Sequence, residues 1–238
     1  MCGRFTLTKR PQAIDSTALD AAFNATSWSQ QHNIGPTQDV PVIANPASTP
    51  DLQVTPMQWG LVPAWSNPQK ITSPLINARA ETAHEKPSFR SAYKQRRCLI
   101  PTDGFYEWHR SGNTRQAYYF QQCNESLFYM AGLWERWSSQ TEDECLLSFT
   151  ILTTAANSLM HPYHNRMPVI LNENDGLEWI SHNNATSPQT LPNILTPYSS
   201  EKMQHRPVSA LVNNIRNDSP ECIAPYTIPT DTQFNLGF

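Results

Sequence analysis

The sequence predicts an α+β domain that is mainly antiparallel β, with a barrel-like core and a few short peripheral helices. Three observations lead to this prediction. Short apolar runs recur along the chain and are separated by turn signals. With 20 prolines and only 8 glycines, the chain is a poor candidate for long helices. No shift in composition precedes residue 183, so we expect one domain at 1–225 and a flexible tail at 226–238.

Short strands and helical segments alternate in the first half of the chain. Pro11 suits the first turn of a helix that buries one apolar face. Pro41 interrupts a strand and predicts that this strand lies at a sheet edge. The expected elements are strands at 3–7, 40–44, 52–59 and 75–79, a helix from Pro11, a loop at 24–39 and a helix or loop at 81–95.

Hairpins dominate the second half. The run Ser111-Gly112-Asn113 is a hairpin turn signal, and Asn172 is a good cap for a helix that ends near His182. The expected strands are 97–108 (broken at Pro101), 117–121, 127–137, 145–153, 167–171 and 207–212, with a helical turn at 155–161. A polar linker is expected at 183–200, and the chain is expected to be loosely held from 217 onward.

Composition and charge limit the class of protein. Apolar residues make up 39% of the chain, with 7 Trp, 8 Tyr and 9 Phe, which excludes wholesale disorder. No apolar stretch approaches the ~20 residues of a membrane helix, and no secretory signal is recognisable, so we expect a cytoplasmic monomer with no membrane partner. The net charge of −3 argues against bulk nucleic-acid binding. Residues 1–97 carry a net charge of +4, however, which is compatible with a local basic face.

The five cysteines are an odd number and form no C-x-x-C pair. This pattern speaks against a disulfide framework and against a zinc site, and we expect neither metal nor cofactor. Cys98, Cys123 and Cys145 lie among apolar neighbours and are predicted to be small core residues. Cys2 differs from them because it follows the initiator methionine.

Cys2 has unusual chemistry if Met1 is removed, as is general before a small second residue. The new α-amine would titrate near ~7.7–8.0, well below lysine, so a fraction is neutral near neutral pH. A neutral amine forms a Schiff base with an aldehyde, and the adjacent thiol can then close a five-membered thiazolidine ring. An N-terminal cysteine is therefore suited to capturing aldehydes. The simpler interpretation is a small apolar residue that opens a strand.

Other polar side chains interrupt apolar strands in the segments 75–82, 97–108 and 149–157. Glu107 lies between Tyr106 and Trp108, where a carboxylate is costly unless paired. It is either a proton shuttle or the structural partner of an arginine. Asn77 and Arg79 alternate along one predicted strand and therefore share a face.

A fourth such segment, 164–171, contains His164 two residues before Arg166. This histidine is either a proton donor that also orients an anion or an ordinary loop histidine. Trp65, in the turn-rich run 59–65, is either a stacking platform for a base or a core residue.

Taken together, these residues resemble the SRAP family, the SOS response-associated peptidases or abasic-site-processing proteins. The resemblance runs from Cys2 to about Pro225. It is carried by Met-Cys-Gly-Arg-Phe at 1–5, Trp-Gly-Leu-Val-Pro-Ala-Trp at 59–65, Asn-Ala-Arg-Ala-Glu-Thr at 77–82, Asp-Gly-Phe-Tyr-Glu-Trp at 103–108, His-Asn-Arg-Met-Pro at 164–168, and closing elements at 207–213 and 217–222.

The resemblance implies a DNA-repair protein that senses abasic sites in single-stranded DNA by covalent capture. It assigns Cys2 as the crosslinking nucleophile and Asn77 as the residue that positions the opened sugar. Glu107 would shuttle protons, and His164 would assist ring opening and reversal of the link. The family name also implies peptidase activity, understood as self-removal of Met1.

The same resemblance assigns the DNA contacts. Arg79 and Arg166 match phosphate-contacting positions, Arg4 and Trp65 are expected in the same groove, and Thr153 is expected to approach the site.

Two alternatives remain open from the residues alone. One is a cysteine peptidase or amidohydrolase in which His164 activates the thiol of Cys2. The other is a non-catalytic module that binds single-stranded DNA, with Cys2 inert. In the covalent-capture hypothesis, the Schiff base would also allow strand cleavage by β-elimination, which is a lyase side activity.

Overall fold

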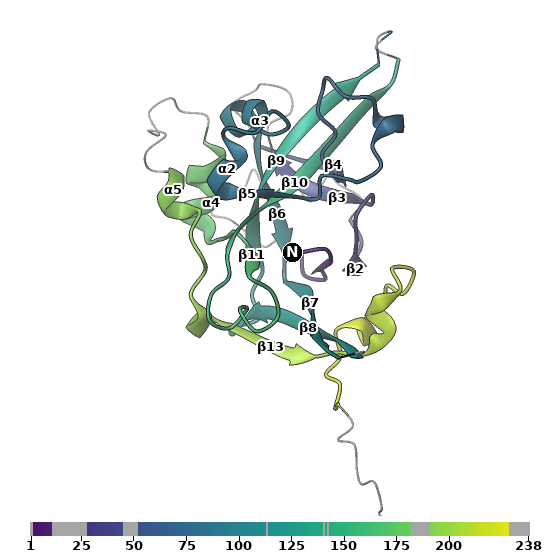
Figure 1. The fold of residues 1–238 in the computed structure, drawn as a ribbon, viewed down its shortest axis with the longest axis vertical. Coiled ribbons are helices and arrows are strands. Elements are labelled where there is room, and N and C mark those ends of the chain that lie inside the picture. Colours follow the sequence, from purple (N-terminus) through teal and green to yellow (C-terminus); the bar gives the residue numbers. More distant parts are fainter. Residues whose placement is uncertain are drawn as a thin grey trace, which may run out of the picture.

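The structure is a computed structural model in which two β layers enclose the N-terminal residues (Figure 1). It describes residues 2–10, 28–44, 52–112, 114–139, 141, 143–181 and 191–228. The helix predicted from Pro11 and most of the predicted tail lie outside these ranges.

Thirteen strands and eight short helices are present in the described ranges. The strands are β1 (Phe5–Leu7), β2 (Gln31–Ile34), β3 (Asp39–Ala44), β4 (Gln53–Trp59), β5 (Asn77–Arg79), β6 (Arg97–Thr102), β7 (Gly104–Ser111), β8 (Thr114–Gln122), β9 (Phe128–Ser138), β10 (Cys145–Ala155), β11 (Arg166–Pro168), β12 (Ile170–Leu171) and β13 (Met203–Pro207). The helices are α2 (Ala80–Ala83), α3 (Arg90–Gln95), α4 (Glu173–Ile180) and α5 (Leu191–Ile194), with 3-10 turns η1 (Pro68–Lys70), η2 (Ser200–Lys202), η3 (Ala210–Asn213) and η4 (Pro220–Cys222).

The larger sheet closes on itself into a five-stranded barrel. The strands β10, β4, β3, β6 and β9 pair in that order, and β9 pairs back with β10 from Ser138↔Cys145 to Gly132↔Ile151. This confirms the predicted barrel-like core with short peripheral helices. The barrel is mixed rather than purely antiparallel, because β10 runs parallel to β4, and it also runs parallel to β5 outside the ring.

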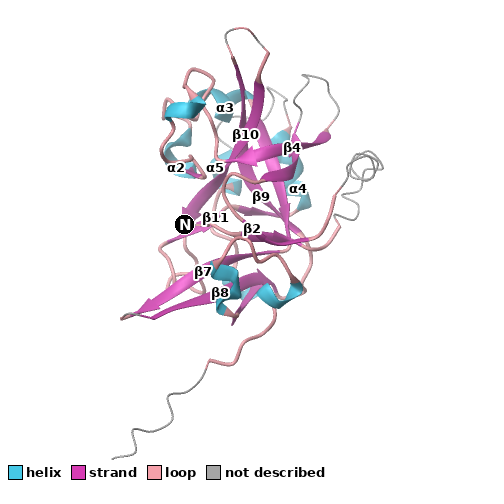
Figure 2. Cartoon of the chain, turned by 90° about the vertical axis from the view of Figure 1, so that its right-hand side faces the viewer, coloured by secondary structure: helices cyan, strands magenta, loops and turns pink. Residues whose placement is uncertain are grey.

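The smaller sheet has five strands in the order β13-β8-β7-β1-β2 and lies below the barrel in Figure 2. β1 pairs on one side with β7 at Phe5↔Phe105 and on the other with β2 at Phe5↔Ile34. The first residues of the chain are thereby held between two strands.

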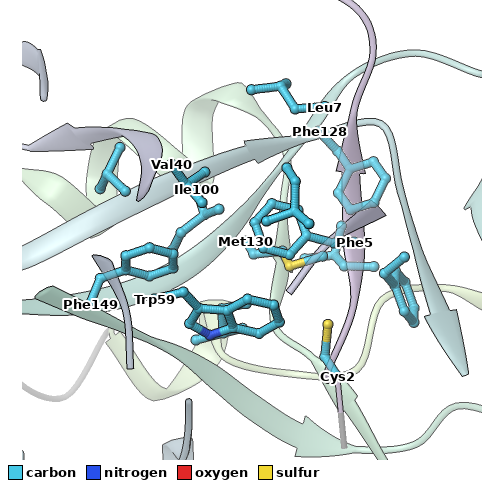
Figure 3. Packing of buried hydrophobic residues seen from close by; sticks show 14 of the residues in the cluster. Cys2, Phe5, Leu7, Val40, Trp59, Ile100, Phe128, Met130 and Phe149 are labelled. Atoms are coloured by element: carbon cyan, nitrogen blue, oxygen red, sulfur yellow. The ribbon is translucent and has the colours of Figure 1, made fainter. Parts of the chain in front are cut away.

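The main core fills the barrel and the space between the two sheets. Alternate residues of each barrel strand contribute to it, as period-two side-chain alternation requires. Figure 3 shows Trp59, Phe149 and Met130 in this cluster, with the Cys2 side chain directed toward it. The opposite faces of the barrel strands form a second cluster covered by the helices. Cys98 is buried as predicted.

Helix α4 begins where the sequence predicts. The Asn172 side chain accepts a hydrogen bond from the Asp175 N–H at 3.0 Å and so caps the helix. The buried face of the helix contributes Trp179, whose indole N–H donates to the Cys98 carbonyl at 3.1 Å on the outside of the barrel.

Two predictions that were based on proline positions are wrong. β3 is an interior strand, between β4 and β6, not the edge strand that Pro41 indicated. The strand tolerates Pro41 because its pairing with β6 is confined to Ile43↔Leu99. The run 97–108 breaks at Asp103 rather than at Pro101, since Pro101 stays in register with Tyr129 of β9.

Other boundaries also differ from the prediction. β2 occupies part of the predicted loop 24–39, and the last strand is β13, because residues 210–213 form a 3-10 turn instead. Cys123 and Cys145 are exposed, not core residues. The expectation of a loose chain from 217 is wrong: Cys222 is fully buried, and the Tyr226 N–H donates to the Pro207 carbonyl at 3.0 Å.

Candidate functional site

Cys2 lies in the interior at the end of the pairing between β1 and β7. The Tyr106 N–H donates to the Arg4 carbonyl at 2.9 Å, which extends this pairing beyond Phe5 toward the N-terminus. Only 1% of Cys2 is exposed, and its thiol lies 3.9 Å from the Arg4 carbonyl oxygen. The second residue of the chain is therefore a packed, ordered group.

Asn77 holds the backbone of Cys2 from the barrel side. β5 places it beside Ile151 of β10, and its side-chain amide donates to the Cys2 carbonyl at 2.8 Å. The other amide atom, Oδ1, is buried without a hydrogen-bond partner among the described residues. An acceptor adjacent to Cys2 is therefore available to a hydroxyl or N–H group of a ligand.

Glu107 approaches Cys2 from the smaller sheet. It lies on β7 opposite Tyr118 of β8 and is 7% exposed. By alternation it shares a face with Phe105, which belongs to the main core. Its charge acts on the Cys2 thiol.

Burial is the largest influence on the Cys2 thiol, and the negative charge of Glu107 is the next. Both disfavour the thiolate, and together they raise the pKa of Cys2 to about 12. A thiol in this environment stays protonated near neutral pH. It is not the activated thiolate of a cysteine hydrolase.

A row of polar residues crosses β5, β10 and β11 next to Asn77. Arg79 pairs in register with Thr153, and Thr153 pairs with Pro168 of β11. Arg79 is exposed, as a phosphate-binding residue must be, whereas Thr153 is fully buried. The structure thus brings Asn77, Arg79 and Thr153 to neighbouring positions.

Arg166 lies on β11 in register with Ala155, two residues along β10 from Thr153, and its charge is already paired. Its guanidinium donates to both carboxylate oxygens of Glu81, at 2.6 and 2.8 Å, and also to the Thr153 carbonyl. The hydrogen bond from Arg166 lowers the pKa of Glu81. A phosphate would have to compete with this carboxylate.

His164 lies in the turn between β10 and β11. Its Nδ1 accepts a hydrogen bond from the Arg166 backbone N–H at 2.9 Å. In the neutral ring the proton then resides on Nε2. The histidine is half-buried, and Tyr163 beside it packs among His109, Tyr118, Phe120 and His205.

Arg4 and Trp65 make other contacts. Arg4 donates to Asn33 Oδ1 at 2.7 Å and to the Val212 carbonyl at 2.9 Å, so its guanidinium is directed toward the C-terminal part of the chain. Trp65 is 72% exposed and lines a groove of about 780 Å³ together with Trp137 and Leu146 of the β9–β10 hairpin.

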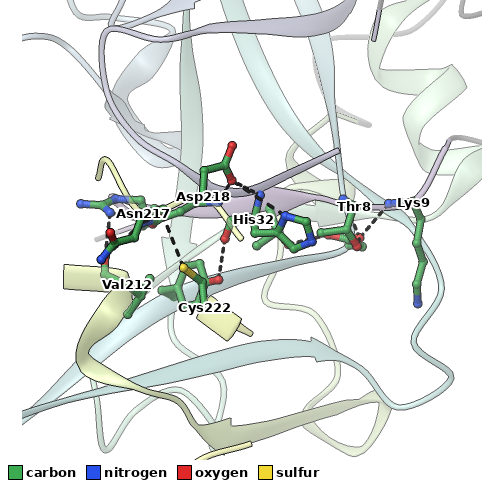
Figure 4. Close-up of polar contacts among 12 residues, drawn as sticks. Thr8, Lys9, His32, Val212, Asn217, Asp218 and Cys222 are labelled. Atoms are coloured by element: carbon green, nitrogen blue, oxygen red, sulfur yellow. Dashed lines mark hydrogen bonds and ion pairs between the residues drawn. The ribbon is translucent and has the colours of Figure 1, made fainter. Parts of the chain in front are cut away.

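Two residues that organise the site were not identified as such from the sequence. Glu81 pairs with Arg166, and its only signal was its place within the motif 77–82. Asp103 accepts from the Thr8 and Lys9 backbone N–H groups at 2.8 and 3.0 Å and ties the end of β1 to β7 (Figure 4). Hydrogen bonds across nearly a hundred residues leave no trace in local sequence patterns.

The described residues contain no group of three or more His, Cys, Asp or Glu side chains arranged to hold a metal ion. None of the helices in the described ranges combines the length and apolarity needed to span a bilayer.

Comparison with known proteins agrees with the fold. Residues 1–215 match the family described as SOS response associated peptidase (SRAP). The chain belongs to this family.

Similar relatives include the abasic site processing protein YoqW of Bacillus subtilis (strain 168), which is 40% identical over 225 residues covering 94% of this chain and 99% of that protein. The abasic site processing protein HMCES of Xenopus tropicalis is 31% identical, over 83% of this chain and 66% of that protein. Among solved structures, a protein from Bacteroides thetaiotaomicron is similar with a TM-score of 0.77 and 26% identity, covering 95% of this chain and all of that one.

Proposed function

We propose that this protein processes abasic sites in single-stranded DNA by covalent capture through Cys2 after removal of Met1. The observation that carries the proposal is the buried Cys2, held through its carbonyl by Asn77 and placed under the charge of Glu107. The names of its relatives, abasic site processing proteins, support the substrate class.

Capture begins at the amine of Cys2. The nitrogen lone pair attacks the C1′ aldehyde of the ring-opened sugar, and loss of water gives a Schiff base. The thiol then adds to the imine carbon: an S–C bond forms, the C=N π electrons move to nitrogen, and the thiol proton is transferred to that nitrogen. The product is a thiazolidine that links protein and DNA.

The raised thiol pKa favours this order of steps over direct attack by sulfur. A thiol with a pKa of about 12 supplies little thiolate near neutral pH. An α-amino group ordinarily titrates near ~7.7–8.0, well below a lysine side chain, so an N-terminal amine is the readier source of a neutral nucleophile. Sulfur therefore reacts second, on a carbon that the Schiff base has already made electrophilic.

Three residues serve this chemistry beside Cys2. Glu107, whose charge acts on the Cys2 thiol, takes the proton released from one step and returns it in the next. Asn77 Oδ1 accepts a hydrogen bond from the opened sugar. His164, through Nε2–H, assists ring opening and reversal of the link.

The strand itself is bound by charge and stacking. Arg79 is exposed and lies two residues from Asn77 on β5. Thr153 pairs with Arg79 in register and accepts a hydrogen bond from Arg166, and Trp65 offers an exposed ring on which a base can stack.

Strand cleavage is a side path of the same intermediate. The Schiff base acidifies the C2′–H bond, so a base can remove that proton while the C3′–O bond breaks and the 3′ phosphate leaves. Closure of the thiazolidine removes the C=N bond and ends this elimination. The balance between crosslink and lyase product therefore depends on how fast sulfur adds.

The peptidase activity in the family description fits a single hydrolysis, in which the Met1–Cys2 amide bond is cleaved and the reactive amine is released. A general cysteine peptidase that cleaves other chains would need a thiolate–imidazolium pair. Burial and the charge of Glu107 both raise the pKa of the Cys2 thiol and so disfavour its thiolate.

A denaturing gel tests the proposal. The protein is incubated with a single-stranded oligonucleotide that contains one abasic site, and we expect a heat-stable shifted band. Cys2→Ala keeps the amine but lacks sulfur, so it should give only a link that borohydride must trap. Absence of any heat-stable band with the wild type, together with cleavage of peptide substrates, would contradict the proposal.

A further inference from the structure

Arg166 and Glu81 form a two-bond ion pair that connects β11 to α2. The guanidinium donates to Oε1 at 2.6 Å and to Oε2 at 2.8 Å. The Arg166 side chain is only 14% exposed, against 50% for Glu81. Paired bonds in this geometry fix orientation as well as distance.

Each residue of the ion pair lies close in the sequence to a residue of the proposed site. Glu81 is in α2, which follows directly on β5, the strand that carries Asn77. Arg166 begins β11, and its backbone N–H is the donor to His164 Nδ1. The ion pair therefore joins the strand of Asn77 to the turn of His164.

Arg166 also contacts the strand that lies between these two segments. Besides Glu81, it donates to the Thr153 carbonyl of β10. Its side chain is therefore a structural link between Glu81, Thr153 and the chain beside His164.

We propose that Glu81 is a positioning residue which, through Arg166, holds His164 in its Nε2–H form and in register with Asn77. The inference builds on the proposed function, because the proton transfers of His164 are part of that function. Glu81 touches neither the sugar nor Cys2 in this account.

The test uses Glu81→Gln, which keeps the shape of the side chain but removes its charge. We expect the 15N signals of the His164 ring to change from the Nε2–H pattern toward a mixture of tautomers. Reversal of the crosslink should slow about tenfold, part of the ~10²–10⁴-fold that a positioned acid or base contributes, with an altered pH profile. Affinity for an oligonucleotide with a tetrahydrofuran site, which has no aldehyde, should stay unchanged.

Glu135→Gln is the matched control. Glu135 pairs with Arg96 at 2.8 Å and, unlike Glu81, is largely buried; it lies on β9, away from the motif of His164. This variant should lose stability without a change in the His164 signals or in the reversal rate. A general effect of breaking any ion pair would change both variants alike, and that result would overturn the proposal.

Two further outcomes would also overturn it. Unchanged His164 signals in Glu81→Gln would show that the ion pair does not set the ring. Tighter binding of the tetrahydrofuran oligonucleotide, with a salt dependence steeper by ~0.7 in slope, would show that Glu81 instead competes with a phosphate for Arg166. If the wild type forms no crosslink, the proposed function fails, whereas the nitrogen signals still decide the role of Glu81.

Discussion

At the scale of single residues, the site depends on Cys2 being both buried and uncharged. A protonated thiol packs beside Trp59 and Met130 without the desolvation cost that a thiolate would bring (Figure 3). The same burial leaves the amine as the first nucleophile. Stability and chemistry thus favour the same protonation state.

Thiol labelling tests this state directly. With iodoacetamide at about pH 8, the exposed Cys123 and Cys145 should react well before Cys2, because Cys2 is buried and supplies little thiolate. Peptide mapping by mass spectrometry measures the order of labelling. Fast labelling of Cys2 would indicate an activated thiolate and support the peptidase alternative.

Replacing Glu107 should change two rates in opposite directions. Because the charge of Glu107 raises the pKa of the Cys2 thiol, Glu107→Gln should lower that pKa and speed alkylation of Cys2. The same change removes the proton shuttle, so crosslink formation should slow by about 10²-fold. A parallel rise in both rates would show that Glu107 acts only through its charge.

Affinity is the control for this variant. Binding of the tetrahydrofuran oligonucleotide should be nearly unchanged in Glu107→Gln, since the carboxylate is buried rather than placed on a phosphate-binding surface.

At the scale of elements, strand positions were predictable where apolar runs are bounded by turn signals. β4, β9 and β10 follow such runs closely. The parallel pairing of β10 with β4 and β5 was not predictable, because it joins segments about 75 to 90 residues apart through no turn signal. Asn77, Arg79 and Thr153 come together only through that pairing.

The contact that holds the end of β1 also joins distant segments and was not predictable from local sequence. The sequence motif 103–108 indicated a turn and a carboxylate, but not that Asp103 would hold the end of β1. Asp103 is 3% exposed and accepts hydrogen bonds from the side chains of Thr6 and Thr8 as well as from two backbone N–H groups.

Asp103→Ala should therefore destabilise the protein by about 2–4 kcal/mol, because several buried donors lose their acceptor at once. Urea unfolding followed by tryptophan fluorescence measures the change. Asp39→Ala, at an exposed position of β3, is the control and should change stability little. A loss equal to that of the control would show that water replaces these bonds without cost.

At the scale of the whole molecule, the C-terminal residues complete the site that the N-terminal residues begin. The Asn33 side-chain amide donates to the carbonyls of Val212, Asn214 and Asn217, and the Asn33 N–H donates to Asp218 at 3.0 Å (Figure 4). Arg4 shares the Val212 carbonyl. Residues at the two ends of the described chain therefore hold β1 and β2 in place.

Asn33→Ala should loosen this closure. We expect a loss of about 2–3 kcal/mol in stability from the carbonyls left without a donor, and a slower crosslink because Cys2 lies just before β1 in the chain. Hydrogen exchange of the β1 and β2 amides measures the local effect. Exchange that rises uniformly over the whole molecule would show that Asn33 contributes only to global stability.

The central claim is that the amine and thiol of Cys2 jointly capture the sugar aldehyde, and intact mass spectrometry of the protein–DNA adduct tests it most directly. We predict the mass of the polypeptide without Met1 plus that of the oligonucleotide, less one water, in a species that survives heating. An adduct that retains Met1, or one that Cys2→Ala forms equally well without borohydride, would contradict the account.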